Sequence, residues 1–219
     1  MNRLAIFDCD GTLVDSQLNI CLAMEDCFAR AGLAAPCRER ARRVVGLSLV
    51  EAMRAMLPEA DPEFHITLAE DYKLAFHRLR GQGLVDEPLY EGVTDLIDAL
   101  ESDGWLLGIA TGKSDRGLGL CLAHHGLSRR FVTLQTADRH PSKPHPSMVE
   151  QAMADAGADR ATPIMIGDTS FDMAMARAAG VTAIGVAWGY HEPRELRDAG
   201  AHHVADHPSD ILELIKALA

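Results

Sequence analysis

The residues best suited to chemistry lie near the start of the chain, where Asp8 and Asp10 follow the apolar run 4–7 and a Gly-Thr pair comes next. An unbroken apolar run of this kind is typical of a strand buried on both faces of a parallel sheet. Residues two apart on an extended chain point to the same side, so the two carboxylates would repel each other unless a proton or a cation lies between them. Oxygen ligands of this type suit Mg²⁺. On these two residues alone, a polar strand end with turn chemistry explains the pattern equally well.

Two further stretches carry polar residues that suit a phosphate group. Thr111-Gly112 follows the apolar run 105–110, and a hydroxyl with backbone N–H groups at such a strand-to-helix turn fits phosphate oxygens. Lys143 lies among prolines in the stretch 142–146, so the backbone would aim the ammonium group. Taken singly, Thr111 is also a common helix cap and Lys143 is also an ordinary solvated loop lysine.

A second pair of aspartates lies in the stretch 167–172. Asp168 comes directly after the apolar run 164–166, and Asp172 falls four residues later, near the first turn of an expected helix. Asp172 has a simple structural explanation, because a carboxylate in that position complements the helix dipole. Asp168 has no such explanation, and it is therefore a candidate for chemistry at the same sheet edge as Asp8.

Composition narrows the class of protein and its partners. The chain has 219 residues, of which 47% are hydrophobic and 24% charged, as in an ordinary globular protein with one core or a core plus a smaller insert. A formal net charge of −11 argues against a nucleic acid or an anionic membrane surface as partner. Only residues 1–3 precede the first expected strand, so we expect no signal peptide, and no apolar run is long enough to span a bilayer. The five cysteines form no C-x-x-C pair and indicate a reducing cytoplasm.

The elements that position these residues change character along the chain. Residues 16–83 read as helices throughout: one apolar stripe ends at Gly32, Ser48 and Glu51 predict a capping box, and Asp61-Pro62 starts another helix. After that segment, apolar strands alternate with helices. The strands expected there are 105–110, 131–135, 164–166 and 181–187.

Alternating strands and helices indicate βα units on a parallel sheet with helices on both faces. The first strand can join that sheet only if the all-helical segment is an insertion. We therefore expect an α/β fold, a doubly wound parallel-sheet, Rossmann-like core with an inserted all-helical cap domain. The expected core comprises residues 1–14 and 86–219, and the expected cap comprises residues 15–85. Hinges are expected where the two patterns meet, at 14–16 and 83–88.

The four stretches together resemble the motifs of the haloacid dehalogenase superfamily of phosphohydrolases. They read D-x-D-G-T, a Thr after the second core strand, a Lys before a Pro, and G-D-x-x-x-D. Their order, their strand-end placement and the helical insertion all agree with that superfamily, and the resemblance covers essentially the whole chain. Within the superfamily the chain looks like the branch with a helical cap between the first and second motifs, which includes phosphoglycolate phosphatases. The tail Trp188-Gly189-Tyr190 is also similar to that branch.

The resemblance implies a role for each of these residues. Asp8 would be the nucleophile that forms an aspartyl-phosphate, and Asp10 would protonate the leaving alkoxide and later take a proton from water. The cofactor would be Mg²⁺, held by Asp8, the backbone carbonyl of Asp10, and Asp168, with Asp172 orienting the metal site. The residues that would hold the phosphoryl oxygens are Thr111, Gly112 and Lys143.

The implied function is hydrolysis of a small phosphorylated metabolite by a Mg²⁺-dependent cytoplasmic phosphatase, monomeric or dimeric, similar to phosphoglycolate phosphatase. Phosphoglucomutase-type transfer and pyrophosphate hydrolysis on the same fold remain alternatives. β-Phosphoglucomutases tend to carry an arginine three residues after a cap glycine, whereas here Leu49 follows Gly46. Metal-free dehalogenases use only the first aspartate, so Asp10 and Asp168 argue against them. A phospho-accepting signalling receiver would usually be shorter and would need no helical insertion.

Two residues outside these motifs also carry expectations. Arg43 belongs to the one basic concentration in an acidic chain and lies close to the Gly46 turn. We expect it to meet a second anionic group of the substrate, such as a carboxylate, although a solvated helix face is the simpler explanation. Cys9 stands where the family resemblance leads us to expect a bulky apolar residue, and strand alternation turns it away from the carboxylates into the core.

Overall fold

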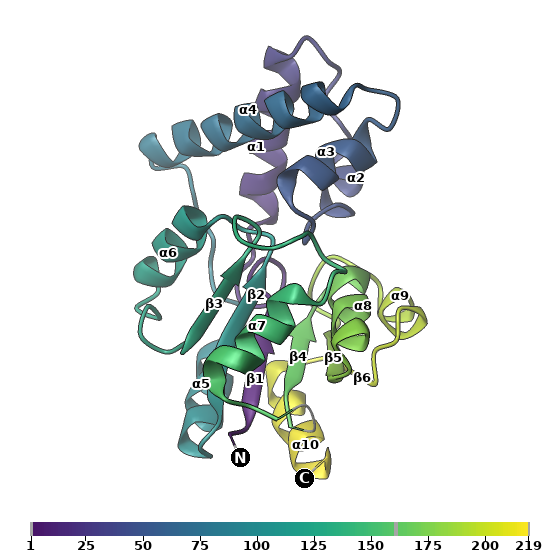
Figure 1. Cartoon of the computed structure of the whole chain (residues 1–219). Coiled ribbons are helices and arrows are strands. Elements are labelled where there is room, and N and C mark those ends of the chain that lie inside the picture. The colour runs from purple at the N-terminus through teal and green to yellow at the C-terminus, as the bar shows by residue number, and fades with distance from the viewer. Residues whose placement is uncertain (1, 160–161, 219) are drawn as a thin grey trace.

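The computed structural model describes residues 2–159 and 162–218 and is built on a six-stranded sheet (Figure 1). All neighbouring strands are parallel, in the order β3-β2-β1-β4-β5-β6. The strands are β1 (Leu4–Phe7), β2 (Leu106–Thr111), β3 (Thr133–Thr136), β4 (Ile164–Gly167), β5 (Thr182–Val186) and β6 (His203–Ala205). Every residue of β1 is buried because the strand lies in the middle of the sheet, between β2 and β4.

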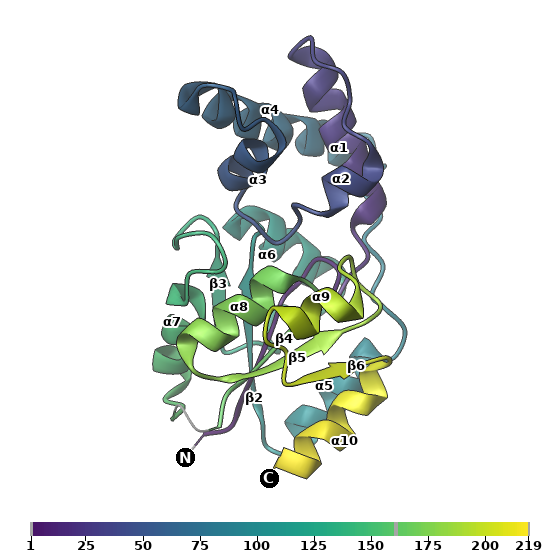
Figure 2. The same cartoon turned by 90° about the vertical axis from the view of Figure 1, so that its right-hand side faces the viewer.

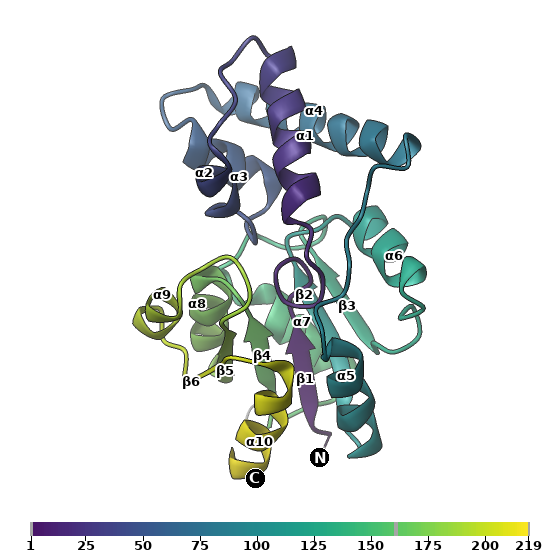
Figure 3. The ribbon, with the colours of Figure 1, turned by 180° about the vertical axis from the view of Figure 1, so that it is seen from behind.

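Helices cover both faces of the sheet, and the side chains of β1 alternate between the two apolar cores. Leu4 and Ile6 pack with α7, α8 and α9 on the face that Figure 1 shows in front, whereas Ala5 and Phe7 pack with α5, α6 and α10 on the face seen in Figure 3. These helices are α5 (Val93–Ser102), α6 (Asp115–His124), α7 (Ser147–Ala156), α8 (Ser170–Ala179), α9 (Pro193–Asp198) and α10 (Pro208–Leu218). The predicted doubly wound parallel sheet is confirmed.

Four helices lie beyond the carboxyl ends of the strands, at the edge of the sheet where the polar motifs also lie (Figure 2). They are α1 (Gln17–Arg30), α2 (Arg38–Arg42), α3 (Leu49–Met56) and α4 (Pro62–Gly81). They enclose an apolar core of their own, in which Met53, Leu68 and Ala75 are fully buried. We call α1–α4 with their connections the helical unit.

Two chain segments join the helical unit to the sheet, and they lie side by side. The Asp15 N–H donates to the Pro88 carbonyl at 2.8 Å, and Val14 and Leu89 form an antiparallel bridge. Asn19 adds a further link, since its side-chain amide donates to the Leu84 carbonyl at 2.8 Å. Both expected hinge segments therefore belong to one hydrogen-bonded neck. The division into two domains at residues 14 and 86 stays a prediction.

The predicted capping box at Ser48 is wrong. Helix α3 does begin after Ser48, but the serine side chain makes no cap hydrogen bond. The Ser48 N–H donates instead to the hydroxyl of Ser142, in the loop between β3 and α7, at 2.8 Å. Glu51 pairs with Arg54. A contact between the helical unit and the sheet thus takes the group that the local motif would use.

Some elements were not predicted. Helix α9 and strand β6 are short, so they have too few apolar residues to show a period, whereas α2 falls within the segment 16–83 that was predicted to be helical. Cys9 lies where it was expected, fully buried among the apolar residues of the core. All five cysteines are free thiols. None of the helices in the described residues combines the length and the apolar character needed to cross a membrane.

Candidate active site

Asp8 and Lys143 form the centre of the site. The Lys143 ammonium lies 2.9 Å from Asp8 Oδ1 and 2.7 Å from Asp172 Oδ1, and all three side chains are buried. Asp8 Oδ1 also accepts the Cys9 N–H at 2.7 Å. Asp8 Oδ2 is buried and has no hydrogen-bond partner among residues 2–159 and 162–218. One oxygen of this carboxylate is therefore fixed, while the other is available to a ligand or a substrate.

Asp172 is held by the start of helix α8 as well as by Lys143. Its Oδ2 accepts from the Thr169 N–H at 3.0 Å and from the Thr169 hydroxyl at 2.7 Å, and the Thr169 Oγ1 accepts the Asp172 N–H at 3.3 Å, which completes a capping box. One oxygen of Asp172 thus caps the start of α8, and the other contacts Lys143. The residue orients Lys143 from a rigid helix terminus.

Asp168 follows β4 and is held by two donors. The Thr12 hydroxyl donates to its Oδ1 at 3.0 Å, and the Tyr190 N–H donates to its Oδ2 at 2.9 Å. Gly11 passes so close that a Cβ there would lie 2.2 Å from Asp168 Oδ2, and its φ of 83° is left-handed. Glycine after Asp10 is thus required both by the turn and by the approach of Asp168.

Burial dominates the electrostatics of these carboxylates. The pKa of Asp8 is raised to about 7, mainly by desolvation and also by the negative charges of Asp172 and Asp10, against the lowering effect of Lys143. Burial, Asp8 and Asp172 hold the pKa of Asp168 well above its ordinary value. Burial by itself would lower the pKa of Lys143, but the charges of Asp172 and Asp8 outweigh it and raise that pKa above its usual value. The ammonium is therefore charged throughout the physiological range.

A divalent cation fits this group. One carboxylate oxygen each from Asp8, Asp168 and Asp172 lies within 4.8 Å of the others. Among the described residues, three buried carboxylates face one buried ammonium, that of Lys143, which leaves an excess of negative charge. Carboxylate oxygens are the donors that Mg²⁺ prefers. The donor set and its excess negative charge thus match a hard cation.

Asp10 lies at the other side of Asp8 and faces a second ion-pair network. Its Oδ1 accepts from the Ser16 hydroxyl and lies 2.8 Å from the Lys113 ammonium, which also contacts Glu87 at 2.6 Å. Arg80 at the end of α4 completes the network through Glu87 at 3.1 Å. The sequence motifs did not single out Lys113 or Glu87. The available signal was the position of Lys113 directly after Thr111-Gly112.

Thr111 ends β2 inside the site and is fully buried. Its Oγ1 accepts the Lys113 N–H at 3.2 Å, so the hydroxyl proton is free to be donated elsewhere. Gly112 lies against the helical unit, because a Cβ there would be 2.8 Å from the Leu47 carbonyl oxygen and 2.9 Å from that of Gly46. The turn after β2 therefore contributes both a donor and a tight contact with the helical unit.

The model of the haloacid dehalogenase-like hydrolase family matches residues 5–186 of this chain, which include all four motifs. The chain belongs to this family. The resemblance inferred from the motifs is therefore confirmed, and with it the enzyme class, a phosphatase of the haloacid dehalogenase type.

Named relatives of this hydrolase agree with the family. A protein of Dickeya dadantii named "Probable phosphatase IndB" is 35% identical over all of this chain and 95% of its own length. A phosphoglycolate phosphatase of Agrobacterium fabrum is 30% identical over 87% of this chain and 82% of its own. Among solved structures, a hydrolase from Pseudomonas syringae superposes with a TM-score of 0.87 at 26% identity, and the match covers both chains completely.

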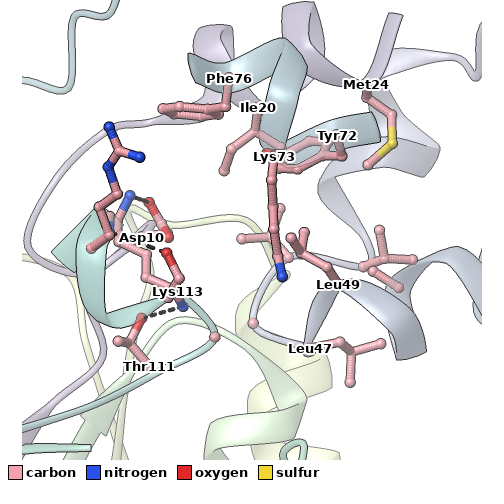
Figure 4. Close-up of a pocket in the computed structure, with 18 of the residues that line it drawn as sticks. Asp10, Ile20, Met24, Leu47, Leu49, Tyr72, Lys73, Phe76, Thr111 and Lys113 are labelled. Atoms are coloured by element: carbon pink, nitrogen blue, oxygen red, sulfur yellow. Dashed lines mark hydrogen bonds and ion pairs between the residues drawn. The ribbon is translucent and has the colours of Figure 1, made fainter. Parts of the chain in front are cut away.

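A cavity of about 380 Å³ separates the catalytic edge of the hydrolase from the helical unit (Figure 4). Asp8, Asp10, Thr111 and Gly112 line it on the side of the sheet. The opposite side is lined by apolar residues, among them Ile20, Met24, Leu47, Leu49, Tyr72 and Phe76. The candidate residues and the helical unit thus line the same cavity.

Arg43 lies elsewhere. Its guanidinium is about half exposed and pairs with Glu195 of α9 at 2.5 Å, and Arg43 is not among the residues that line the cavity. Its neighbours Val44 and Val45 line the cavity instead. In the structure Arg43 therefore links the helical unit to α9 through an ion pair. The expected contact with a second substrate anion has no support in this geometry.

Proposed function

We propose that this hydrolase cleaves phosphate monoesters of small metabolites through an aspartyl-phosphate on Asp8. The observation that carries the proposal is the state of the Asp8 carboxylate. Cys9 and Lys143 hold Oδ1, whereas Oδ2 has no partner in the described residues and Asp8 lines the cavity. A carboxylate fixed through one oxygen presents the other as a nucleophile in a defined direction.

The transferred phosphoryl group would lie between the end of β2 and Lys143. Thr111 has a hydroxyl proton to donate, the turn at Gly112 offers backbone N–H groups, and Lys143 supplies a positive charge beside Asp8. These groups are held by the sheet and by the start of α8, so they are in place before the substrate binds. Preorganised donors of this type stabilise the charge that develops on the phosphoryl oxygens.

Asp10 is the proposed acid and base. In the first half-reaction a bond forms between Asp8 Oδ2 and phosphorus, the bond from phosphorus to the ester oxygen breaks, and Asp10 protonates the departing alkoxide. In the second, Asp10 takes a proton from the attacking water while the bond from phosphorus to Asp8 breaks. Ser16 and Lys113 fix the Asp10 carboxylate at the cavity wall for both steps.

Mg²⁺ is the proposed cofactor, and Asp8, Asp168 and the Asp10 backbone carbonyl are the proposed ligands. The cation would supply positive charge to the phosphoryl oxygens. Thr12 and Tyr190 orient Asp168, and Asp172 acts on the site through Lys143.

A test of the metal uses the protein as it is. Excess EDTA is expected to abolish hydrolysis of p-nitrophenyl phosphate, and Mg²⁺ is expected to restore it. Thr12→Val removes the hydroxyl that orients Asp168 and should raise the Mg²⁺ concentration for half-maximal activity by about 10–100-fold. Thr67→Val on the exposed side of α4 is the matched control. The same shift should appear in the Mg²⁺ dependence of the melting temperature. Full activity in EDTA would refute the metal role.

We propose that residues 15–85, which include the helical unit, form a cap over the sheet edge. The neck formed by the segments at 14–16 and 83–89 would let it move, and closure over the sheet edge would exclude water from the phosphoryl group. In this structure the unit already touches the sheet domain through Gly112 and through the bond from Ser48 to Ser142.

Gly112→Ala tests that contact. The added Cβ would meet two backbone carbonyl oxygens at under 3 Å, so the turn at Gly46 must move away from β2. We expect kcat/KM to fall roughly tenfold to a hundredfold, because small displacements near a reacting group are costly. Gly119→Ala in α6, with nothing within 4 Å of the new Cβ, should leave kcat/KM unchanged. If the two variants had the same kcat/KM, the contact between Gly112 and the turn at Gly46 would not contribute to catalysis.

Two features support a small cytoplasmic substrate. The five cysteines are free thiols, as is usual in a reducing compartment. The chain also aligns along most of its length with a relative named phosphoglycolate phosphatase, whose substrate is a small phosphorylated acid. A screen of phosphorylated metabolites, with inorganic pyrophosphate and glucose phosphates included, would separate this function from pyrophosphatase and mutase activity.

A further inference from the structure

We propose that the preferred substrates are phosphate monoesters with an extended apolar leaving group, an alkyl chain or a ring, rather than a short carboxylic acid. This inference rests on the proposed phosphatase function and names the substrate class of the same site. It follows from the chemistry of the cavity wall that faces Asp8 and Asp10.

The wall opposite the catalytic aspartates is apolar over three helices and a turn. Figure 4 shows Ile20 and Met24 of α1, Tyr72 and Phe76 of α4, and Leu49 at the start of α3 around one space, into which Lys73 of α4 also extends. Val44 and Val45 extend this surface toward α2. A substrate bound at Asp8 therefore has its leaving group against hydrocarbon, and burial of apolar surface is the main contribution available to its binding.

The size of the cavity fits an extended group. Its volume of about 380 Å³ lies within the range of roughly 300–1,000 Å³ typical of pockets that bury drug-sized ligands. A leaving group of two carbons would leave most of the apolar wall in contact with water. Leu120 of α6 also lines the cavity and is 40% exposed, so an apolar leaving group could cover it as well.

Three cations of the wall, Lys73, Arg80 and Lys113, are already paired, so they are poor receptors for a substrate carboxylate. Lys73 lies 2.7 Å from Glu70, Arg80 pairs with Glu87, and Lys113 contacts both Glu87 and Asp10. Arg116 has no acidic partner among the described residues, but it is an exposed residue of the first turn of α6, where water solvates the charge. A carboxylate buried beside Arg80 or Lys113 would have to break one of the existing ion pairs with Glu87 or Asp10.

A series of alkyl phosphates tests the inference without changing the chemistry of bond cleavage. Ethyl, butyl and hexyl phosphate have leaving alcohols of similar basicity, so differences in kcat/KM report binding of the chain. We expect kcat/KM to rise at least about tenfold from ethyl to hexyl phosphate, and hexyl phosphate to exceed phosphoglycolate. A flat series, or a preference for phosphoglycolate, would overturn this inference alone. No turnover of any ester would overturn the proposed function together with it.

Variants locate the effect in the wall. Phe76→Ala and Leu120→Asn should each reduce kcat/KM more for hexyl than for ethyl phosphate. Leu120 is already 40% exposed, so its polar substitution leaves folding intact. Leu74→Asn is the matched control on α4, because Leu74 is 54% exposed and is not a lining residue of the cavity. It should affect neither ester. Equal losses for both esters in the wall variants would contradict the proposal.

Discussion

Asp8→Asn is expected to lower kcat for a phosphate monoester by roughly 10⁴-fold or more, as removal of a nucleophile does in other covalent enzymes. The amide retains the shape of the carboxylate but cannot form the acyl-phosphate. The variant should still fold, since Cys9 can donate to the amide oxygen as it donates to Oδ1 in the structure. Steady-state kinetics at saturating Mg²⁺ measure the loss.

The covalent step gives a second readout for the same variant. The wild-type hydrolase, quenched with acid during turnover, should carry phosphate that hydroxylamine releases, as expected of an acyl-phosphate, and Asp8→Asn should carry none. Asp198→Asn at the end of α9 is the control, because its side chain is 72% exposed and belongs only to a surface ion pair. Substantial turnover by Asp8→Asn would exclude the proposed covalent mechanism.

The general plan of the site could be predicted because it depends on topology. In a parallel sheet all strands end at the same edge, so residues after β1, β2 and β4 must meet. Asp8, Thr111 and Asp168 are each preceded by a buried apolar run that is visible in the sequence. Lys143 follows no strand directly, and only the resemblance to the family connected it with the other three.

The contacts that complete the site could not be predicted, because they join residues distant in sequence. Tyr190 holds Asp168 through a backbone N–H, which no residue type specifies. The network around Asp10 unites Lys113 after β2, Glu87 in the neck and Arg80 in α4, and each of these alone is an ordinary surface charge in the sequence. Their pairing depends on how the helical unit lies against the sheet.

Arg43 and Ser48 show the converse case, in which a pattern that is local in the sequence has its partner far along the chain. A cluster of arginines in an acidic chain suggested a substrate anion, but Arg43 pairs with Glu195, a residue 152 positions later. The box expected at Ser48 is replaced by a bond to Ser142. In both cases the partner lies outside the helical unit. Contacts between the helical unit and the rest of the chain therefore replace the contact that the local motif would make.

Lys143→Met is expected to destabilise the fold more than any other single change in the site. The ammonium is buried between Asp8 and Asp172 at 2.9 and 2.7 Å, and its removal leaves two carboxylates unpaired in the interior. Breaking a buried ion pair in this way costs about 3–5 kcal/mol, which corresponds to a fall in melting temperature of roughly 6–20 °C for a chain of this size. The activity should be lost as well, since Lys143 is proposed to bind the phosphoryl group.

The dependence of this loss on pH and metal identifies its cause. Without Lys143 the pKa of Asp8 rises further, because the ammonium lowers it in the wild type. Folding stability contributed by a carboxyl with a raised pKa is present at low pH and lost as the pH rises, so the variant should be hurt more at pH 8 than at pH 5. Mg²⁺ should return part of the stability by taking the place of the missing charge. Lys73→Met, an identical substitution at a side chain that is 45% exposed, should change the melting temperature little at either pH. A similar melting temperature for both variants would show that Lys143 does not hold the buried carboxylates together.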